Sequence, residues 1–383
     1  MDYQEIETFH IRILINTPQA AVMRETNEGV FWKKMKRFKT EKGLRMKLTI
    51  KDVARAAKVS VATASMALNH RDGVSEKTRA KVLGIAQEMN YVPDHSARSL
   101  VMQSSNVIGL MIPEIQNPFY SAMVDILTRI AEDKGYTLLL GISNSSSRQE
   151  AEYVRMFLSR RVCGVIVVPM LANHPDISHL SMLRSADVPV VFCTENYANC
   201  EEPLVMCDFA SGQHAITKYL LDKGLRDFWF VSTDMDVQFA RFRYEGFCRA
   251  MREYGLEVNP KRVMLLQSPR YQEAYEATDR IVDDLPEAVL CINDIMTMAI
   301  MKRMMERGLR IPRDVSLAGF DDVMFSELVS PPLTTVRQPL KAICEKTMDI
   351  LEEKLRAGAR QAEVERGRTY LLPPELVIRE TTR

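Results

Sequence analysis

The segment from residue 49 to residue 92 constrains the fold most, because capping residues divide it into three short helices. Thr49 stands where a helix N-cap is expected, and Asp52 follows three residues later in the capping-box position. Apolar residues then recur at helical spacing, which predicts a first helix over about 50–57. The polar break at 58–60 ends this pattern and begins a tight turn.

Two further serines start the remaining helices of this segment. Ser60 predicts the N-cap of a second short helix over about 61–68, and Ser75 predicts the cap of a third. The buried face of the third helix is expected to comprise Val82, Ile85, Ala86 and Met89. Pro93 ends the segment. Two short helices joined by three or four residues form a helix-turn-helix, whose second helix fits the major groove of DNA.

The charge of this part of the chain suits a nucleic-acid partner. Residues 46–104 contain nine lysines and arginines against five aspartates and glutamates, a net charge of +4, whereas the whole chain carries +1. A local excess of cations favours contact with phosphates. A solvated basic face has the same composition, so the charge supports DNA binding without establishing it.

The same segment resembles the lactose-repressor (LacI/GalR) family of bacterial transcription regulators, and the resemblance continues through nearly all of the remaining chain. The residues that carry it are Thr49–Ala54, Val59–Thr63, Leu68–Asn69, Val74–Arg79, Tyr91–Pro93 and Ala97–Leu100. It implies a DNA-binding unit, a hinge helix and a ligand-binding, dimerising domain. A helical bundle without a nucleic-acid partner is the alternative.

The resemblance also implies a set of DNA contacts. These are Thr49, Ser60, Val61, Ala62, Thr63, Ser65, Met66, Asn69, Ala97 and Leu100. Thr63 and Ser65 match positions that contact phosphate or the groove wall. Val61 and Ala62 lie at the start of the second helix, which points toward base edges. Leu100 matches a hinge-helix leucine that wedges into the minor groove and kinks DNA. Without that context, Leu100 would be an ordinary linker residue.

One position departs from many relatives in a way that bears on DNA sequence. Met66 stands where many family members carry arginine or histidine. An arginine can hold guanine through two hydrogen bonds, and a methionine cannot. The operator is therefore expected to depart from the common family consensus, with apolar contact to thymine methyls in place of that hydrogen-bonded base contact.

From residue 105 onward, near-continuously apolar strands alternate with amphipathic helices. This alternation indicates a parallel sheet covered on both faces. A second α/β set begins near residue 203. The fold class is thus a small all-α helix-turn-helix DNA-binding domain plus an α/β two-lobed periplasmic-binding-protein-like domain. The family resemblance implies that the chain crosses between the lobes, and crossings are expected near residues 204 and 330.

A chain of 383 residues suits two or three domains. The predicted division is a non-family extension over 1–45, the helix-turn-helix domain over 46–92, a hinge helix and linker over 93–104, and the two-lobed domain over 105–383. The extension is interpreted as a disordered tail. A start codon placed too early and a basic, aromatic arm that contacts nucleic acid are the alternatives.

An effector is expected in the crevice at the carboxyl ends of the strands, where two-lobed α/β proteins bind ligands. By resemblance, Phe119 and Tyr120 line that pocket, Arg241 donates hydrogen bonds to ligand oxygens, and Asp294 accepts them. Asp294 could equally cap a helix starting at Ile295, or do both.

Two departures from the family leave the identity of the effector open. Cys207 and Asp208 stand where the family often has an Asp-Asn pair, and Pro269 stands where it has an aromatic residue. The resemblance implies a small polar effector that is a sugar or a sugar derivative. Neither the direction of its effect on DNA binding nor the regulated genes can be predicted from these residues.

No enzymatic motif is convincing, and no cofactor or metal site is expected. The sequence lacks nucleophile-elbow, Walker, dinucleotide-glycine and HExxH motifs. The adjacent pair Asp321-Asp322 matches a structural turn of the family rather than an acid pair. Seven scattered cysteines without a C-x-x-C pair argue against a disulfide framework and against zinc. The expectation is a protein that is not an enzyme.

The expected partners are double-stranded operator DNA, a sugar-like effector and a second copy of the chain. No leucine heptad follows the last domain, so a dimer is expected rather than a tetramer. No apolar run reaches 18 residues and no secretory signal is visible, which predicts no membrane span and a cytoplasmic, nucleoid-associated location. A sugar-binding transport protein of the same fold and an enzyme on a doubly wound sheet are the competing hypotheses.

Overall fold

The computed structural model describes residues 48–69, 72–91, 105–169, 176–198, 200–357 and 367–383. The described residues fall into two compact units, which divide between residues 101 and 102. The predicted extension over 1–45 lies outside the described residues. So do the hinge and its two proposed DNA contacts, Ala97 and Leu100.

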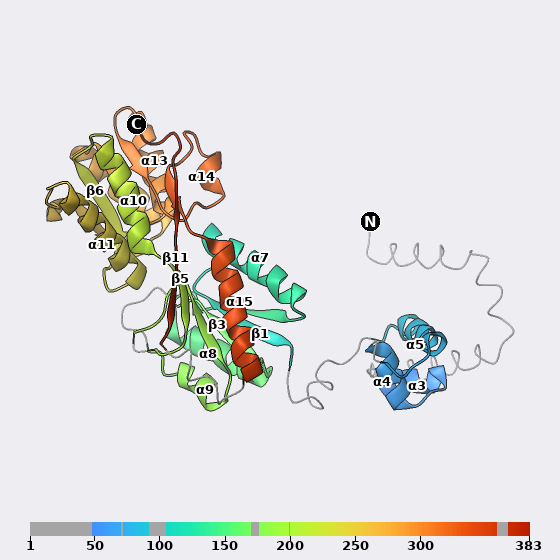
Figure 1. Ribbon diagram of the computed structural model, residues 1–383. Helices are drawn as coiled ribbons and strands as arrows, with labels where there is room; N and C mark the ends of the chain where they lie inside the picture. Colours follow the sequence, from blue (N-terminus) through green and yellow to red (C-terminus); the bar gives the residue numbers. More distant parts are fainter. Residues whose placement is uncertain (1–47, 70–71, 92–104, 170–175, 199, 358–366) are drawn as a thin grey trace, which may run out of the picture. The chain divides into compact units, whose positions relative to one another are not determined.

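The first unit contains the three predicted helices (Figure 1). They are α3 (Ile50–Ala57), α4 (Val61–Leu68) and α5 (Glu76–Glu88). The capping box is confirmed, because the Asp52 carboxylate accepts hydrogen bonds from the backbone N–H and the hydroxyl of Thr49 at 3.0 and 2.7 Å. The chain turns between α3 and α4 at Lys58, whose φ of 55° is left-handed. This turn fixes the direction in which α4 leaves the unit's core.

Small side chains let these three helices pack closely. Their shared core comprises Val53, Ala54, Ala57, Ala64, Ala67, Val82, Ala86 and Met89. Val82, Ala86 and Met89 were predicted to be buried and are, while Ile85 is half-buried against the same core.

Gly84 in α5 leads to a prediction about the stability of this unit. A β-carbon added at Gly84 would meet nothing within 4 Å, and its φ is not left-handed. Alanine is a better helix former than glycine by about 0.8–1 kcal/mol. We expect Gly84→Ala to raise the free energy of unfolding of the first unit by up to about 1 kcal/mol in a urea titration followed by circular dichroism. A lower free energy of unfolding would contradict the open environment of Gly84.

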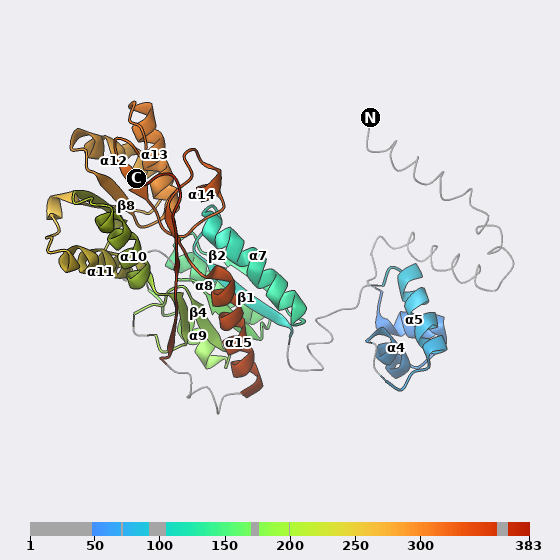
Figure 2. The same ribbon diagram turned by 45° about the horizontal axis from the view of Figure 1, so that its top comes forward.

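The first lobe of the second unit is built on a six-stranded sheet whose pairings are all parallel. In spatial order its strands are β11 (Thr369–Leu372), β5 (Leu204–Cys207), β4 (Val190–Cys193), β3 (Gly164–Val167), β1 (Val107–Ile112) and β2 (Thr137–Ile142). Its helices are α7 (Pro118–Asp133), α8 (Ser147–Ser159), α9 (Leu180–Ser185) and α15 (Leu340–Ala357). Helices α7 and α15 lie side by side over one face of the sheet, while α8 and α9 pack together (Figures 1 and 2).

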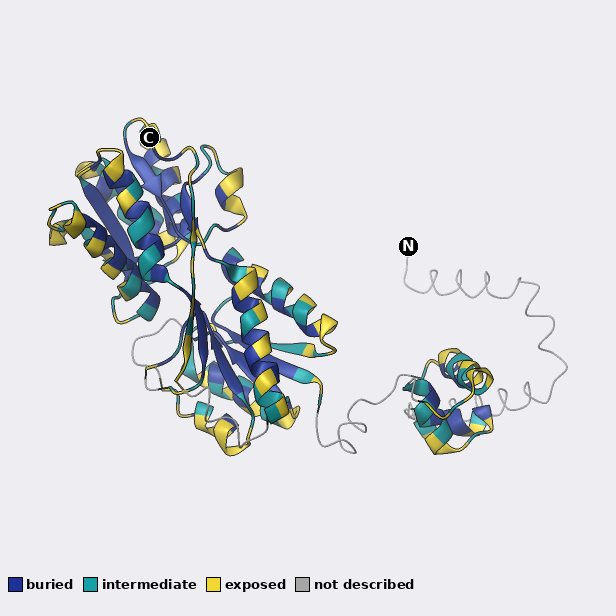
Figure 3. Ribbon diagram, viewed as in Figure 1, coloured by how far each residue is buried: buried dark blue, intermediate teal, exposed yellow. Residues whose placement is uncertain are grey.

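The second lobe has a four-stranded parallel sheet with the order β7-β6-β8-β9. Its strands are β6 (Phe228–Thr233), β7 (Val263–Leu266), β8 (Ala288–Cys291) and β9 (Ser316–Ala318), and β10 (Thr335–Arg337) pairs antiparallel with β12 (Glu375–Val377). The helices are α10 (Phe209–Asp222), α11 (Gln238–Glu253), η3 (Pro260–Arg262), α12 (Tyr271–Asp283), α13 (Asp294–Glu306) and α14 (Phe325–Leu328). The central strands of both lobes are buried (Figure 3).

The chain crosses between the lobes three times. It leaves the first lobe after β5, returns between β10 and α15, and leaves again between β11 and β12. The first and third crossings lie side by side, because the Asp208 N–H donates to the carbonyl of Leu372 at 2.9 Å. The expected crossing positions near 204 and 330 were several residues too early, since β5 still pairs in the first sheet and β10 in the second lobe. The sequence pattern had not predicted β5 as a separate strand.

Candidate functional site

The first candidate site is the exposed face of α4. Its inner side is formed by Ala64 and Ala67, which are fully buried in the core of the first unit. At 3.6 residues per turn, five of the predicted DNA contacts lie within an arc of about 140° on the other side. These five are Val61, Ala62, Ser65, Met66 and Asn69. Val61 is 43% exposed although it is apolar, so the start of the helix presents an aliphatic surface to its surroundings.

Polar groups border this face at the start of α4. The Ser60 hydroxyl accepts a hydrogen bond from the Thr63 N–H at 3.0 Å and pairs with the Thr63 hydroxyl at 2.8 Å. Ser60 and Thr49 are exposed, and Thr63 is half-buried. The N–H groups of a helix start favour an anion. The arrangement is therefore able to receive a phosphate beside an aliphatic patch.

Two residues of the face make contacts within the unit. Asn69 donates from its side-chain amide to the carbonyl of Ser65 at 2.7 Å. Met66 is half-buried, and its Sδ would lie 3.8 Å from a β-carbon built on Gly73. The thioether thus leans toward the turn before α5, so an equally long side chain at 66 would have to turn away from Gly73 to reach a base.

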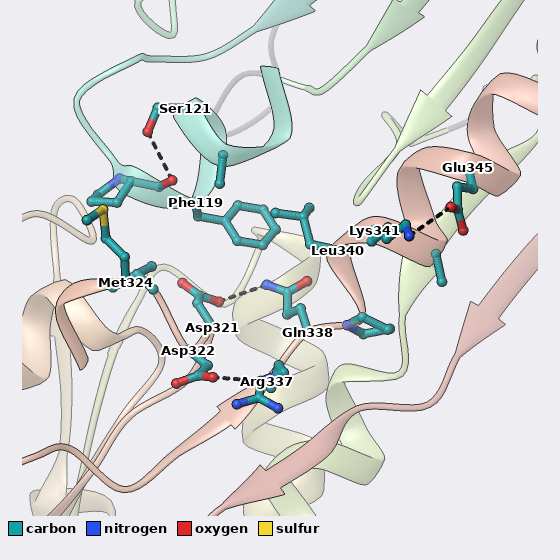
Figure 4. Close-up of a pocket in the computed structure, with 15 residues that line it drawn as sticks. Phe119, Ser121, Asp321, Asp322, Met324, Arg337, Gln338, Leu340, Lys341 and Glu345 are labelled. Atoms are coloured by element: carbon teal, nitrogen blue, oxygen red, sulfur yellow. Dashed lines mark hydrogen bonds and ion pairs between the residues drawn. The ribbon is translucent and has the colours of Figure 1, made fainter. Parts of the chain in front are cut away.

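The second candidate site is the cleft between the lobes of the second unit, where the loops after the strands converge. One groove of about 720 Å³ is lined by the starts of α7 and α15 of the first lobe, by residues 321–324 of the second lobe and by the connecting residues 337–339 (Figure 4). A second groove of about 710 Å³ lies at the carboxyl ends of β2, β6 and β7. It is lined by residues 144–145, 233–237 and 265–270. This is the position at which open parallel sheets bind ligands.

The structure places the four predicted effector residues in different environments. Phe119 lines the first groove, and Tyr120 is buried beside it with the ring centroids 5.6 Å apart. Burial raises the pKa of the Tyr120 hydroxyl well above its usual value, and the nearby Glu195 adds to the shift. Arg241 is exposed and lies over the Phe242 ring. Neither Arg241 nor Asp294 lines either groove.

Asp294 is fully buried and serves as an internal hydrogen-bond acceptor. Its carboxylate accepts from the Val323 N–H at 3.0 Å and from the hydroxyls of Ser326 and Thr335 at 2.7 and 2.5 Å. Burial raises its pKa to about 8. The alternative, that Asp294 caps the following helix, is wrong. Asn293 is the cap, since its Oδ1 accepts from the Met296 N–H at 2.8 Å and α13 begins at Asp294.

Arg243, two residues after Arg241, also lines neither groove but is buried. It is 3% exposed and its guanidinium carbon lies 3.9 Å from the centroid of the Phe320 ring, with Phe209 and Phe239 also against it. Its charge is balanced by Asp321, whose Oδ1 is 3.0 Å away. Burial raises the pKa of Asp321 to about 6, while Arg243 and Gln338 act in the opposite direction.

The sequence interpretation missed Arg243, although the sequence contains a signal for it. Residues Phe239, Ala240, Arg243, Gly246, Phe247 and Ala250 recur at helical spacing and are all buried. Arg243 interrupts this apolar stripe, whereas Arg241 lies off it. A cation within the buried stripe of a helix is the better candidate for a ligand contact or an internal ion pair.

Asp321 and Asp322 bind different partners, in line with the prediction that they form no acid pair. Asp321 accepts from Gln338 at 2.8 Å as well as from Arg243. Asp322 pairs with Arg337 at 2.7 Å and with Arg379 at 2.7 Å. Both aspartates have positive φ values, 116° and 54°. The loop after β9 is therefore held by several polar contacts, of which Figure 4 shows Asp322 with Arg337 and Asp321 with Gln338.

Three contacts cross between the two lobes at this cleft. Glu195, which follows β4, accepts a hydrogen bond from the Phe239 N–H at the start of α11 at 2.8 Å. Gln238 donates to the side chain of Asn196 at 3.1 Å. Arg270 and Glu114 form an ion pair of 3.0 Å. These contacts hold the lobes together, and Glu195 was not among the predicted site residues.

Among the described residues, no group of three or more histidine, cysteine, aspartate or glutamate side chains is arranged to hold a metal ion. The seven cysteines are free thiols. No helix in the described part of the chain combines the length and the apolar composition that a membrane span requires.

Comparison with known proteins gives matches that cover both units. Residues 49–94 match the bacterial regulatory proteins of the lacI family, and residues 217–382 match the periplasmic binding protein-like domain. The HTH-type transcriptional repressor PurR of Vibrio vulnificus (strain CMCP6) is 32% identical over 88% of this chain and 98% of its own length. The HTH-type transcriptional regulator DegA of Bacillus subtilis (strain 168) is 30% identical over the same shares.

Solved structures give the same assignment of fold. The lac repressor dimer bound to operator and the anti-inducer ONPF is 25% identical, with a TM-score of 0.76 over 88% of this chain and 99% of that one. The complex of the transcriptional regulator CelR with cellobiose is 23% identical, with a TM-score of 0.65 over 87% of this chain and 99% of that one. The latter similarity concerns the fold alone.

Proposed function

This chain belongs to the lacI family of bacterial regulatory proteins, and we propose that it is a transcriptional repressor whose affinity for operator DNA changes when a small polar effector binds between its lobes. The observation that carries the proposal is α4, a capped helix that exposes an aliphatic start beside two hydroxyls. Because the proposed partner is DNA, we place the protein in the cytoplasm, at the nucleoid. The same partner favours a regulator over an enzyme or a sugar-transport protein.

We assign the DNA contacts by position on the first unit. Ser60 and Thr63 meet phosphates, because their hydroxyls border the start of α4. Thr49, the N-cap of α3, is assigned a DNA contact by family resemblance alone. Val61 and Ala62 reach base edges and thymine methyls, with Ser65, Met66 and Asn69 farther along the same face. Ala97 and Leu100 are assigned to a hinge helix over 93–104 by family resemblance alone, and the division into residues 46–92 and 105–383 is likewise part of the proposal.

For the effector, we propose a site in the cleft that Phe119 and Tyr120 border. Arg243 takes the role that the family resemblance gave to Arg241, because Arg243 is the buried arginine. Asp294 supports the loop at 323–335 instead of meeting the ligand. CelR is named in complex with the sugar cellobiose and the PurR relatives are named as repressors, so a sugar or sugar derivative is one class of effector among small polar molecules.

We also propose that the protein is a homodimer. Three apolar side chains, Met324, Phe325 and Leu328, are exposed on and beside α14, and Leu328 is 69% exposed. Such side chains in one short segment mark an interaction surface. The lac repressor is named as a dimer on its operator, and a second copy of this chain is the partner that we assign to α14.

The proposal is tested by selecting genomic DNA fragments with the purified protein and measuring the affinity of the best fragment by fluorescence anisotropy. We expect Val61→Glu to weaken this affinity at least about tenfold, since one base contact is worth about 1–3 kcal/mol. Gln87→Glu is the matched control, because it adds the same charge at an exposed position of α5. Equal losses in both variants, or no fragment selected at all, would contradict the role of α4.

Met66→Arg is expected to change the preferred operator sequence as well as the affinity. An arginine at this position can pair with guanine through two hydrogen bonds, worth about 1–3 kcal/mol of discrimination. It must turn away from Gly73, beside which the parent thioether lies. The measurement is a comparison of consensus sequences selected from random DNA by the two proteins. Identical consensus sequences would show that residue 66 does not face the bases.

A further inference from the structure

The carboxylate of Glu195 caps a helix that belongs to the other lobe. Helix α11 starts after Val237, which has no side-chain acceptor for the free N–H groups of the first turn. Glu195 supplies one, through the 2.8 Å hydrogen bond from Phe239 to its Oε1. Both residues are buried, with Glu195 7% exposed. A carboxylate at a helix start is favoured by the helix dipole, so this oxygen has a structural role.

The arginines whose charges act on Glu195 are Arg243 and Arg241. Arg243 is paired with Asp321 at 3.0 Å, and Arg241 is exposed. Within the described residues, no lysine or arginine lies within ion-pair distance of Glu195. Burial accordingly raises the pKa of Glu195 to about 7, although Arg243 and Arg241 act in the opposite direction. The cleft therefore contains one carboxylate that has no cationic partner of its own.

Two buried polar atoms of this region, the acceptor Oε1 of Gln338 and the donor Nε of Arg243, lack partners among the described residues. The second oxygen of Glu195 accepts no hydrogen bond from any described group of the protein. Gln338 lines the first groove and is 5% exposed; its amide nitrogen donates to Asp321, while its Oε1 is buried without a partner. The Tyr120 hydroxyl lies close enough to Glu195, Glu114 and Asp321 to feel their charges. A buried acceptor without a donor is unfavourable, so a ligand that supplies donors would be stabilised here.

We propose that the cleft selects a ligand carrying a protonated amine beside hydroxyl or N–H donors, with the ammonium on Glu195. This inference rests on the proposed function, since it concerns the effector of that same cleft. An ammonium group supplies the missing positive charge and several donors at once. A neutral or anionic counterpart of such a ligand has no positive charge to pair with Glu195.

Replacing Glu195 with glutamine separates ligand selection from the structural role. In Glu195→Gln the side-chain Oε1 still accepts the hydrogen bond from Phe239, so the start of α11 keeps its cap. The second oxygen becomes an NH₂ group, which donates instead of accepting and carries no charge. The variant should therefore keep the fold and lose the preference for amines.

The experiment measures binding of matched probe triplets to the full-length dimer by isothermal titration calorimetry at neutral pH. One triplet is glucosamine, glucose and glucose 6-phosphate; the other is 5′-amino-5′-deoxyadenosine, adenosine and adenosine monophosphate. In at least one triplet we expect the amine to bind about tenfold or more tightly than its neutral partner, as for one charge-assisted hydrogen bond, and more tightly than the acid. In Glu195→Gln the tenfold preference should disappear.

The proposal is overturned if no amine binds more tightly than its neutral partner, if an acid binds as tightly as the amine, or if Glu195→Gln retains the preference. Operator affinity is measured in the same samples. This measurement distinguishes a wrong ligand class from a failure of the proposed regulatory function. An acid that shifts operator affinity would refute the ligand class and leave regulation intact. An amine that binds tightly without changing operator affinity would support the ligand class and contradict regulation through this cleft.

Discussion

Replacing Asp294 with alanine is expected to lower the free energy of unfolding of the second unit by about 3 kcal/mol or more. The carboxylate accepts hydrogen bonds from a backbone N–H and two hydroxyls, and all of these groups are buried. Each buried donor left without an acceptor costs about 1–3 kcal/mol. The midpoint of thermal unfolding, measured by differential scanning calorimetry, should fall by roughly 10 °C.

Asp294→Asn is the matched control for this variant. Its side-chain oxygen can keep the hydrogen bonds from Val323 and Ser326, while its NH₂ group donates to the Thr335 hydroxyl. We expect it to retain most of the parent's stability at neutral pH. If Asp294→Ala unfolded at the same temperature as the parent, the loop after β9 would have to be held by other contacts, and the role assigned to Asp294 would be wrong.

The pH dependence of these proteins gives an independent measurement of the same carboxyl group. Burial raises the pKa of Asp294 from 3.8 to about 8, so the folded protein binds a proton that the unfolded chain has released. The resulting stabilisation is present at acidic pH and is lost as the pH rises through about 8. Urea titrations at pH 6 and pH 9 should show the parent losing stability relative to Asp294→Asn at the higher pH. A constant difference would contradict the raised pKa.

Gly246→Ala is expected to destabilise the second lobe by about 3 kcal/mol. A β-carbon at Gly246 would overlap the carbonyl oxygen of Ala210 and lie 3.0 Å from the backbone nitrogen of His214. These atoms belong to the backbone of α10, which cannot yield as a flexible side chain does. Overpacking typically costs about 1–3 kcal/mol, and rigid backbone places this site at the upper end. The gain in helix propensity, about 1 kcal/mol, does not offset the clash.

Gly84→Ala is the matched substitution for this comparison, because its new β-carbon meets nothing within 4 Å. The two glycine variants should therefore shift the unfolding transitions of their own units in opposite directions in the same urea titration. Because Arg243 lies one turn before Gly246 on the same side of α11, displacement of that helix should also weaken effector binding. A Gly246→Ala protein as stable as its parent would show that α10 and α11 are farther apart than described.

Local sequence chemistry predicted the first unit well. Thr49, Ser60 and Ser75 cap the three helices as expected, because a cap depends on residues three or four positions apart. Helix α7 begins at Pro118, in agreement with the preference for proline in the first helical turn. Strand β5 was not predicted because its four residues leave no periodicity from which to identify it.

The interlobe site was predicted less completely, for a physical reason. Phe119 lines a groove as expected, since it lies in the first turn of the helix that follows β1. Glu195 could not be predicted, because its partner Phe239 lies 44 positions away on the other lobe. The sequence interpretation chose Arg241, on the exposed side of α11, instead of Arg243 on its buried side. The spacing of the apolar residues of α11 distinguishes these two sides. Contacts between lobes depend on how the two sheets come together, and no local pattern records this.

The three crossings between the lobes restrict the motions that an effector can cause. A single connecting strand would leave one lobe free to twist, slide and tilt against the other in any direction. Three crossings, two of which are hydrogen-bonded to each other at Asp208 and Leu372, remove most of these degrees of freedom. What remains is a rotation about an axis through the crossings. A ligand bound in the cleft therefore changes one angle, and residues far from that axis move in a direction that covalent connectivity has already fixed.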